Sequence, residues 1–149
     1  CLTGPLHSST ELHGFLAYLI HCALIGKKYT IIGYEGKQVR DNIHSRDLIT
    51  MFDHFYNDPK FGEVYNAGGG RFSNCSILEA FELIELILNK KVKSEYVKQH
   101  RSGDHKWWIS NINKFKTHYP KWDYTINLST MIDDIGNEID ARLSKENIL

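Results

Sequence analysis

The chain has 149 residues, of which 42% are hydrophobic and 24% are charged, and this composition excludes a disordered or fibrous protein. Eighteen basic and eighteen acidic residues cancel, and no basic stripe is visible, so no nucleic-acid partner is expected. The three cysteines, Cys1, Cys22 and Cys75, form no CxxC pair, which argues against a disulfide framework or a zinc site and favours a reducing cytoplasm. The most apolar run, 15–25, is too short to cross a bilayer, so no membrane partner is expected.

The first half of the chain alternates between helical and extended patterns. The segment 1–5 reads as the end of a strand that enters a turn, and the chain does not begin with Met, so we expect the natural protein to continue upstream. Ser8 and Glu11 stand at capping-box spacing and predict a helix that Gly26 closes. The patterns that follow predict a strand over 29–32, an extended segment over 39–44, and a helix over 45–57 with Leu48, Met51, Phe52 and Phe55 on its inner face.

The second half continues the alternation. The patterns predict a strand over 63–66, a helix from Ser76 with Glu79 three residues later, a strand over 95–97, a short helix over 111–118 and a final helix over about 129–143. Such alternation defines the α/β class. The strands are too few and too short for a complete doubly wound sheet, so we expect late strands of a larger parallel sheet together with a small appended lobe.

Several motifs resemble known sites without meeting their chemical requirements. Gly68-Gly69-Gly70 follows a predicted strand, as in a dinucleotide fingerprint, but the third glycine of that pattern is replaced by Ser73, so a tight turn is the better interpretation. Tyr56 and Lys60 have the spacing of a short-chain dehydrogenase catalytic pair, yet Pro59 between them forbids the helix that the pair needs. The eight histidines form no metal-binding spacing, and His44 is interpreted as a structural hydrogen-bonding residue.

Two arginines are candidates for an anion site. Arg40 lies on the extended segment that leads into the helix at Ser45, and Arg101 precedes Gly103 and Asp104 in a loop. Arginine can bind a pyrophosphate in bidentate fashion, and Asp104 could accept from a ribose hydroxyl. Taken singly, each arginine is better interpreted as an exposed charge or an ion-pair partner. Spacing alone therefore predicts an α/β domain in which an anion site is one alternative.

The segment 38–48 resembles the Arg-Asp-x-Ile-His-x-x-Asp-Leu signature of the extended short-chain dehydrogenase/reductases, the NAD-dependent epimerase/dehydratase family. Other landmarks appear in the family's order: 2–5 at the start, 64–69 in the middle and 101–104 later. Segments 11–15, 36–45 and 75–81 are most similar to the CDP-sugar 2-epimerases of this family, although Asn111 stands where that subgroup has Asp. The resemblance covers nearly the whole chain.

The resemblance implies that residues 1–149 form the C-terminal, nucleotide-sugar-binding portion of a Rossmann-type enzyme, and that the NAD-binding portion lies upstream. It implies that Arg40 and Arg101 bind the substrate pyrophosphate, with Asp104 near the ribose. Leu12 and His13 should line the nucleotide pocket, and Ile32 stands where relatives carry an aromatic residue against the base.

The family reaction is transient oxidation and re-reduction of a sugar carbon by bound NAD. No catalytic residue, cofactor-binding residue or metal ligand of that reaction is found in this sequence, so the chain alone is predicted to be inactive. The expected ligand is a nucleotide diphosphate sugar, with a CDP-sugar favoured, and a homo-oligomeric parent is compatible with the family. A UDP- or dTDP-sugar 4-epimerase or 4,6-dehydratase portion, and a non-catalytic nucleotide-sugar binding module, are the alternatives.

Overall fold

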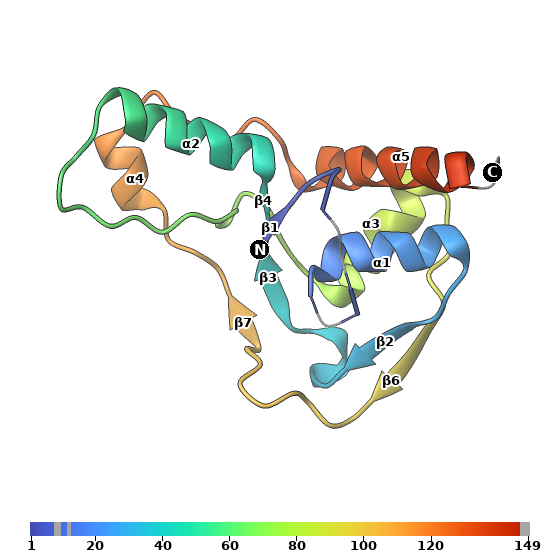
Figure 1. Ribbon diagram of the computed structural model, residues 1–149. Helices are drawn as coiled ribbons and strands as arrows, with labels where there is room; N and C mark the ends of the chain where they lie inside the picture. The colour runs from blue at the N-terminus through green and yellow to red at the C-terminus, as the bar shows by residue number, and fades with distance from the viewer. Residues whose placement is uncertain (8–9, 12, 147–149) are drawn as a thin grey trace.

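The computed structural model describes residues 1–7, 10–11 and 13–146, and it has the predicted α/β class (Figure 1). Its elements in chain order are β1 (Leu2–Thr3), α1 (Phe15–Ile25), β2 (Tyr29–Ile32), a 3₁₀ turn (Tyr34–Gly36), β3 (Val39–Asp41), β4 (Ile43–His44), α2 (Ser45–Asn57), β5 (Asn74–Ser76), α3 (Ile77–Leu88), β6 (Ser94–Val97), β7 (Trp107–Trp108), α4 (Asn113–His118) and α5 (Leu128–Glu146). No helix in this part of the chain combines the length and apolar character that a bilayer crossing requires.

The strands form three small sheets. β1 pairs in parallel with β4, and β2 pairs in parallel with β6. In the third sheet β3 is central, antiparallel to β5 and parallel to β7. β3 and β4 are separated only by Asn42, so the chain changes from one sheet to another within a single residue. The residues on either side of Asn42 therefore belong to different sheets.

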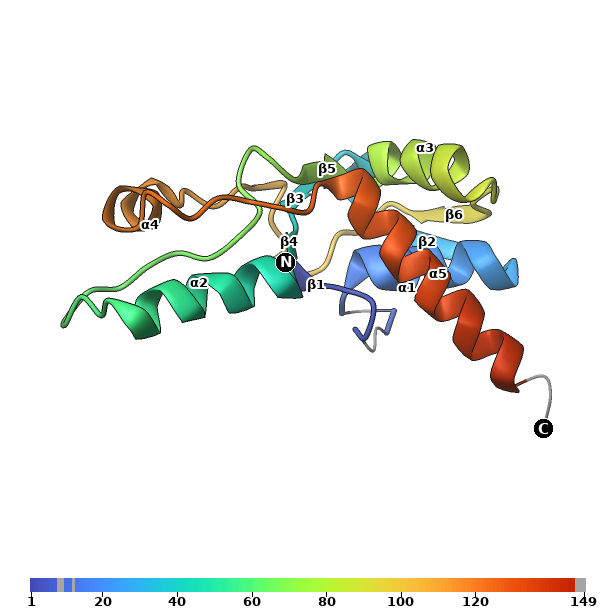
Figure 2. The ribbon, with the colours of Figure 1, turned by 90° about the horizontal axis from the view of Figure 1, so that it is seen from above.

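The larger hydrophobic core lies among α1, α3 and α5, which Figure 2 shows close together at one end of the molecule. Leu19 and Ile20 of α1, Ile84 of α3, and Met131 and Ile132 of α5 are fully buried there. The capping box predicted for α3 is present, because Glu79 N donates to Ser76 Oγ (3.2 Å) while the Glu79 carboxylate accepts from Ser76 N (2.7 Å).

A smaller aromatic core lies between α2 and α4. Its buried members are Ile43, Met51, Ile112, Phe115, Tyr119 and Trp122. The prediction that Phe52 and Phe55 of α2 also face inward is wrong, because their side chains are 62% and 39% exposed. Of α2, Met51 and Leu48 pack into this core, and the ring of Phe55 meets that of Tyr65 edge to face at its margin.

The predicted start of the first helix is also wrong. Thr10 and His13 exchange backbone hydrogen bonds (2.9 and 3.1 Å), which closes a tight turn instead of a helical one. Gly14 then takes a left-handed conformation (φ 76°), and α1 begins only at Phe15. Ser8, the other member of the predicted capping box, lies outside the described residues.

The predicted strand over 63–66 does not form, because no neighbouring strand supplies backbone partners. Val64 is 80% exposed, and its carbonyl accepts from Lys114 Nζ (3.1 Å) instead of from a strand. The strand that does form in this region is β5, which pairs with β3 through Cys75 opposite Arg40. The helix after the glycine turn thus follows a different strand from the predicted one.

Candidate functional site

A cavity of about 600 Å³ opens between β1 and the turn that follows it, the start of α1, β2, β3 and the loop 98–106. Five of the six residues selected from the sequence line this one cavity: His13, Ile32, Arg40, Arg101 and Asp104. The sixth, Leu12, lies outside the described residues. These residues come from four separate segments of the chain, and the fold brings them to one place.

Two arginines of the cavity lie beside one carboxylate oxygen of Asp104. Arg40 Nη2 donates to Asp104 Oδ1 at 2.7 Å, and Arg101 Nη2 lies 3.8 Å from the same oxygen. The Arg40 side chain is 17% exposed and that of Asp104 is 9% exposed, whereas Arg101 is 47% exposed. The Asp104 carboxylate therefore stands between two guanidinium groups, where an anionic ligand would also be attracted.

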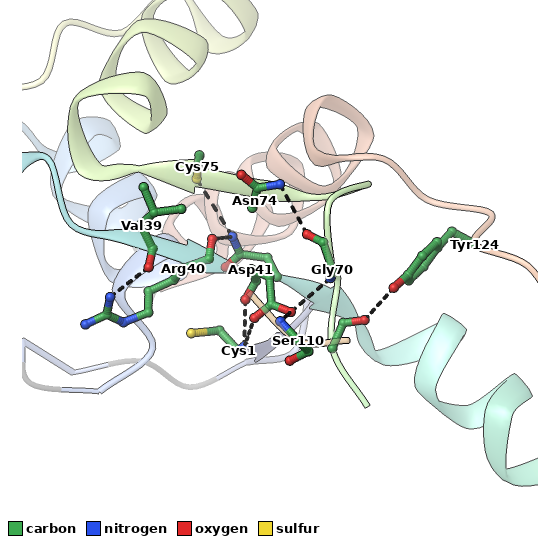
Figure 3. A network of polar contacts seen from close by, with 11 residues as sticks. Cys1, Val39, Arg40, Asp41, Gly70, Asn74, Cys75, Ser110 and Tyr124 are labelled. Carbon is green, nitrogen blue, oxygen red and sulfur yellow. Dashed lines mark hydrogen bonds and ion pairs between the residues drawn. The ribbon is translucent and has the colours of Figure 1, made fainter. Parts of the chain in front are cut away.

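A buried polar network fixes β3, and with it the backbone of Arg40 (Figure 3). Asp41 is fully buried, and its Oδ2 accepts from Gly70 N (2.9 Å) and Ser110 N (3.0 Å). Asn42 N donates to the Ser73 carbonyl at 2.6 Å. The Asp41 carboxylate thus joins β3 to the segments at Gly70 and Ser110.

The glycine turn packs closely against neighbouring segments of the chain. A Cβ on Gly69 would collide with the main-chain carbonyl of Asn42, and one on Gly68 would collide with the side chains of Ser110 and Asp41. The main-chain N–H of Gly70 is already bonded to Asp41. Glycine is needed here for close backbone approach, which agrees with the interpretation of a tight turn.

The end of the signature has a structural role as well. His44 caps α2, because its Nδ1 accepts from Arg46 N (3.1 Å), and this confirms the structural interpretation of His44. Burial lowers the pKa of His44 below its ordinary value, although Asp134 at 3.9 Å opposes this shift. The fully buried Asp47 accepts from Thr125 N (3.1 Å) and Ile126 N (3.2 Å), which ties α2 to the segment before α5.

The described residues do not support a catalytic Tyr56–Lys60 pair or a metal site. Tyr56 is 83% exposed and Lys60 pairs with Asp58, beyond the end of α2, so these two residues do not form a catalytic pair. No group of three His, Cys, Asp or Glu side chains in the described ranges could hold a metal ion. The three cysteines are free thiols, and burial raises the pKa of Cys75 to about 12.

Sequence reasoning did not select several residues that line the cavity. Gln38 is buried and donates from Nε2 to the Ile32 carbonyl (3.1 Å), which ties the start of β3 to the end of β2. Tyr29 and Thr30 also line the cavity, together with His7, whose ring meets that of His13 edge to face at 6.1 Å. Gln38 belongs to the signature segment and could have been selected from it, whereas the others carry no local signal.

The fold is similar to that of solved Rossmann-type, extended short-chain dehydrogenase/reductases, as the motifs predicted. The model of the NAD dependent epimerase/dehydratase family matches residues 2–68. The CDP-paratose 2-epimerase of Salmonella typhi is 35% identical over 92 residues, which are 60% of this chain. The resemblance that the ordered motifs indicated is thereby confirmed.

Solved structures show the same arrangement of elements. The UDP-glucuronic acid 4-epimerase of Bacillus cereus, in complex with UDP-glucuronic acid and NAD, matches 95% of this chain with a TM-score of 0.79 and 27% identity. The dTDP-glucose 4,6-dehydratase of Bacillus anthracis, in complex with NAD, matches 99% of this chain with a TM-score of 0.75 and 25% identity. The chain spans 43% of each of these structures and 27% of the Salmonella relative.

Proposed function

We propose that residues 1–149 are the nucleotide-sugar-binding portion of an NAD-dependent nucleotide-sugar epimerase. The observation that carries the proposal is the position of Arg40 and Arg101 around a single oxygen of Asp104 in the 600 Å³ cavity. A pyrophosphate carries its charge on oxygens that paired guanidinium groups can bind at once, and a cavity of this volume is typical of small-ligand sites.

The neighbouring residues suggest how the rest of the ligand would lie. Asp104 uses Oδ1 for Arg40, so a ribose hydroxyl would have to donate to its other carboxylate oxygen. His13 and Ile32 line the same cavity and would flank the nucleoside. Ile32 offers an aliphatic surface in place of an aromatic ring, so base binding would rest on apolar contact instead of ring stacking.

The sequence has neither a complete glycine-rich dinucleotide fingerprint nor a helical Tyr-x-x-x-Lys pair. We therefore place NAD binding, and the residues that perform the oxidation and re-reduction, outside these 149 residues. The chain by itself should show no epimerase activity, and turnover by it would contradict this assignment.

The CDP-paratose 2-epimerase reaction, also called CDP-tyvelose epimerisation, is our preferred activity for the parent enzyme. Its support is the 35% identity to the Salmonella enzyme. A UDP-sugar 4-epimerase is the second candidate, because the Bacillus cereus structure was solved with UDP-glucuronic acid. Affinities of the chain for CDP and UDP, measured side by side, separate the two: tighter binding of CDP supports the first and tighter binding of UDP the second.

Calorimetric titration of CDP into the chain tests the site itself. Arg40→Ala and Arg101→Ala should each weaken binding by about tenfold or more, which corresponds to roughly 1.5–3 kcal/mol for a lost charged contact. Arg71→Ala removes the same charge from an exposed position outside the cavity and should leave the affinity unchanged. Equal affinities in all four proteins would remove both arginines from the site.

A further inference from the structure

The loop 98–106 carries Arg101 and Asp104, two of the three charged residues on which the proposed anion site depends. Within the loop, the backbone hydrogen bond from Asp104 N to the Arg101 carbonyl (3.2 Å) closes only a local turn. That bond does not tie the loop to the rest of the protein. The position of the two charged residues opposite Arg40 therefore depends on contacts with other segments.

One aromatic side chain outside the loop contacts it at three points. The ring of Tyr34 stacks on the ring of His100, with centroids 5.1 Å apart and planes 10° from parallel. Tyr34 Oη donates to the Asp104 carbonyl at 3.3 Å, and Lys106 Nζ lies 5.4 Å from the centre of the same ring. These contacts reach the loop near its start, in its middle and at its end.

The backbone that presents this ring is strained. Tyr34 and the following Glu35 both adopt left-handed conformations, with φ of 50° and 55°, which non-glycine residues rarely do. Gly33, just before them, has no room for a side chain, because a Cβ there would lie 2.6 Å from the Cβ of His100. Glycine at position 34 would relieve part of the strain, so the presence of tyrosine points to a contribution from its ring.

We infer that Tyr34 is a positioning residue that holds the loop 98–106 so that Arg101 and Asp104 face Arg40 across the cavity. The inference rests on the proposed function, because it assigns Tyr34 a role in pyrophosphate binding at that same site. Tyr34 does not line the cavity, so it acts through the loop and makes no ligand contact of its own.

The test compares three variants of the whole chain. Tyr34→Gly removes the ring and permits the left-handed backbone, and Tyr34→Phe keeps the ring while removing the hydroxyl. Glu35→Gly is the matched control, because it relieves the same kind of strain at an exposed neighbour whose carboxylate pairs with Lys37 (2.7 Å). Amide hydrogen exchange over 98–106 reports on the loop, and calorimetric titration of CDP reports on the site.

In Tyr34→Gly we expect faster exchange over 98–106 and CDP affinity lower by about tenfold, the loss expected of one charged contact. The binding should also become less sensitive to salt, because Arg101 no longer contributes. Tyr34→Phe should stay within about threefold of the wild type, and Glu35→Gly should bind like the wild type with unchanged loop exchange.

Unchanged CDP affinity in Tyr34→Gly would overturn the inference while leaving the proposed function intact. An equal loss of affinity in Glu35→Gly would also overturn it, because the effect would then come from the backbone and not from the ring. Failure of the wild-type chain to bind CDP would instead contradict the proposed function, and the positioning role with it.

Discussion

Arg40 and Asp104 form an ion pair of 2.7 Å across 64 residues of sequence, and both side chains are largely buried. The pair joins the central strand β3 to the loop 98–106 at the wall of the cavity. It supplies the Arg40 guanidinium, which also donates from Nη1 to the Val39 carbonyl (2.7 Å), with an anionic partner. This pair therefore links the stability of the chain to the proposed pyrophosphate site.

Asp104→Asn should destabilise the chain, because Arg40 loses the charge that compensates its burial while the shape of the side chain is kept. We expect the free energy of unfolding to fall by about 1–3 kcal/mol, measured by urea denaturation. Asp58→Asn breaks an exposed pair with Lys60 and should produce no measurable change. Equal urea midpoints for Asp104→Asn and the wild type would show that the pair contributes nothing.

Asp41→Ala tests the buried network behind β3. The change leaves the N–H groups of Gly70 and Ser110 without their acceptor, and the unfolding free energy should fall by about 2–5 kcal/mol. Asp133→Ala, an exposed position on α5, should change it by less than about 0.5 kcal/mol. A loss for Asp41→Ala as small as that of the control would contradict the role assigned to Asp41.

The stability of the chain should depend on pH through His44. Burial lowers the pKa of His44 in the folded state, so the unfolded chain takes up the proton first as the pH falls. The contribution of neutral His44 to the free energy of unfolding is complete above the pKa of the unfolded state, about 6.5. This contribution is lost as the pH falls below that value toward the pKa of the folded state. His44→Asn keeps a capping acceptor but does not titrate.

The free energies of unfolding of the wild type and of His44→Asn are compared by urea denaturation at about pH 8 and about pH 5. The wild type should lose more unfolding free energy than His44→Asn between these values. An identical loss in both proteins would assign the pH dependence to other groups, of which the half-buried His7 is one.

The thiols should differ sharply in reactivity. Burial raises the pKa of Cys75 to about 12 and also raises that of Cys22, whereas Cys1 is exposed. In the native chain a thiol-alkylating reagent at neutral pH should modify Cys1 alone, and all three should react in denaturant. Mass spectrometry of the labelled peptides gives the result, and native labelling of Cys75 would contradict its burial.

The elements that sequence predicted correctly have signals within a few residues. The capping box at Ser76 and Glu79 and the apolar period of α5 are local, and both predictions are confirmed. β5 was missed because its strand character comes from pairing with β3, some 35 residues away. The exposed Phe52 was placed inside because helical periodicity indicates a face and cannot show what covers it.

The candidate site was accessible to sequence reasoning only in part. Arg40 and Arg101 were selected because their motifs occur in the order of a family, and the fold then places both on one cavity. The left-handed backbone of Tyr34 leaves no trace in the sequence, because tyrosine has no preference for that conformation. Its contacts with the loop 98–106 depend on tertiary structure and become visible only there.

In the proposed function, this cavity recognises a pyrophosphate through Arg40 and Arg101. Calorimetric titration of CDP and CMP into the chain tests it most directly, because the two ligands share the nucleoside and differ by one phosphate. CDP should bind about tenfold or more tightly than CMP, and the difference should disappear in the Arg40→Ala/Arg101→Ala double variant. Equal affinities of the wild-type chain for CDP and CMP would contradict it.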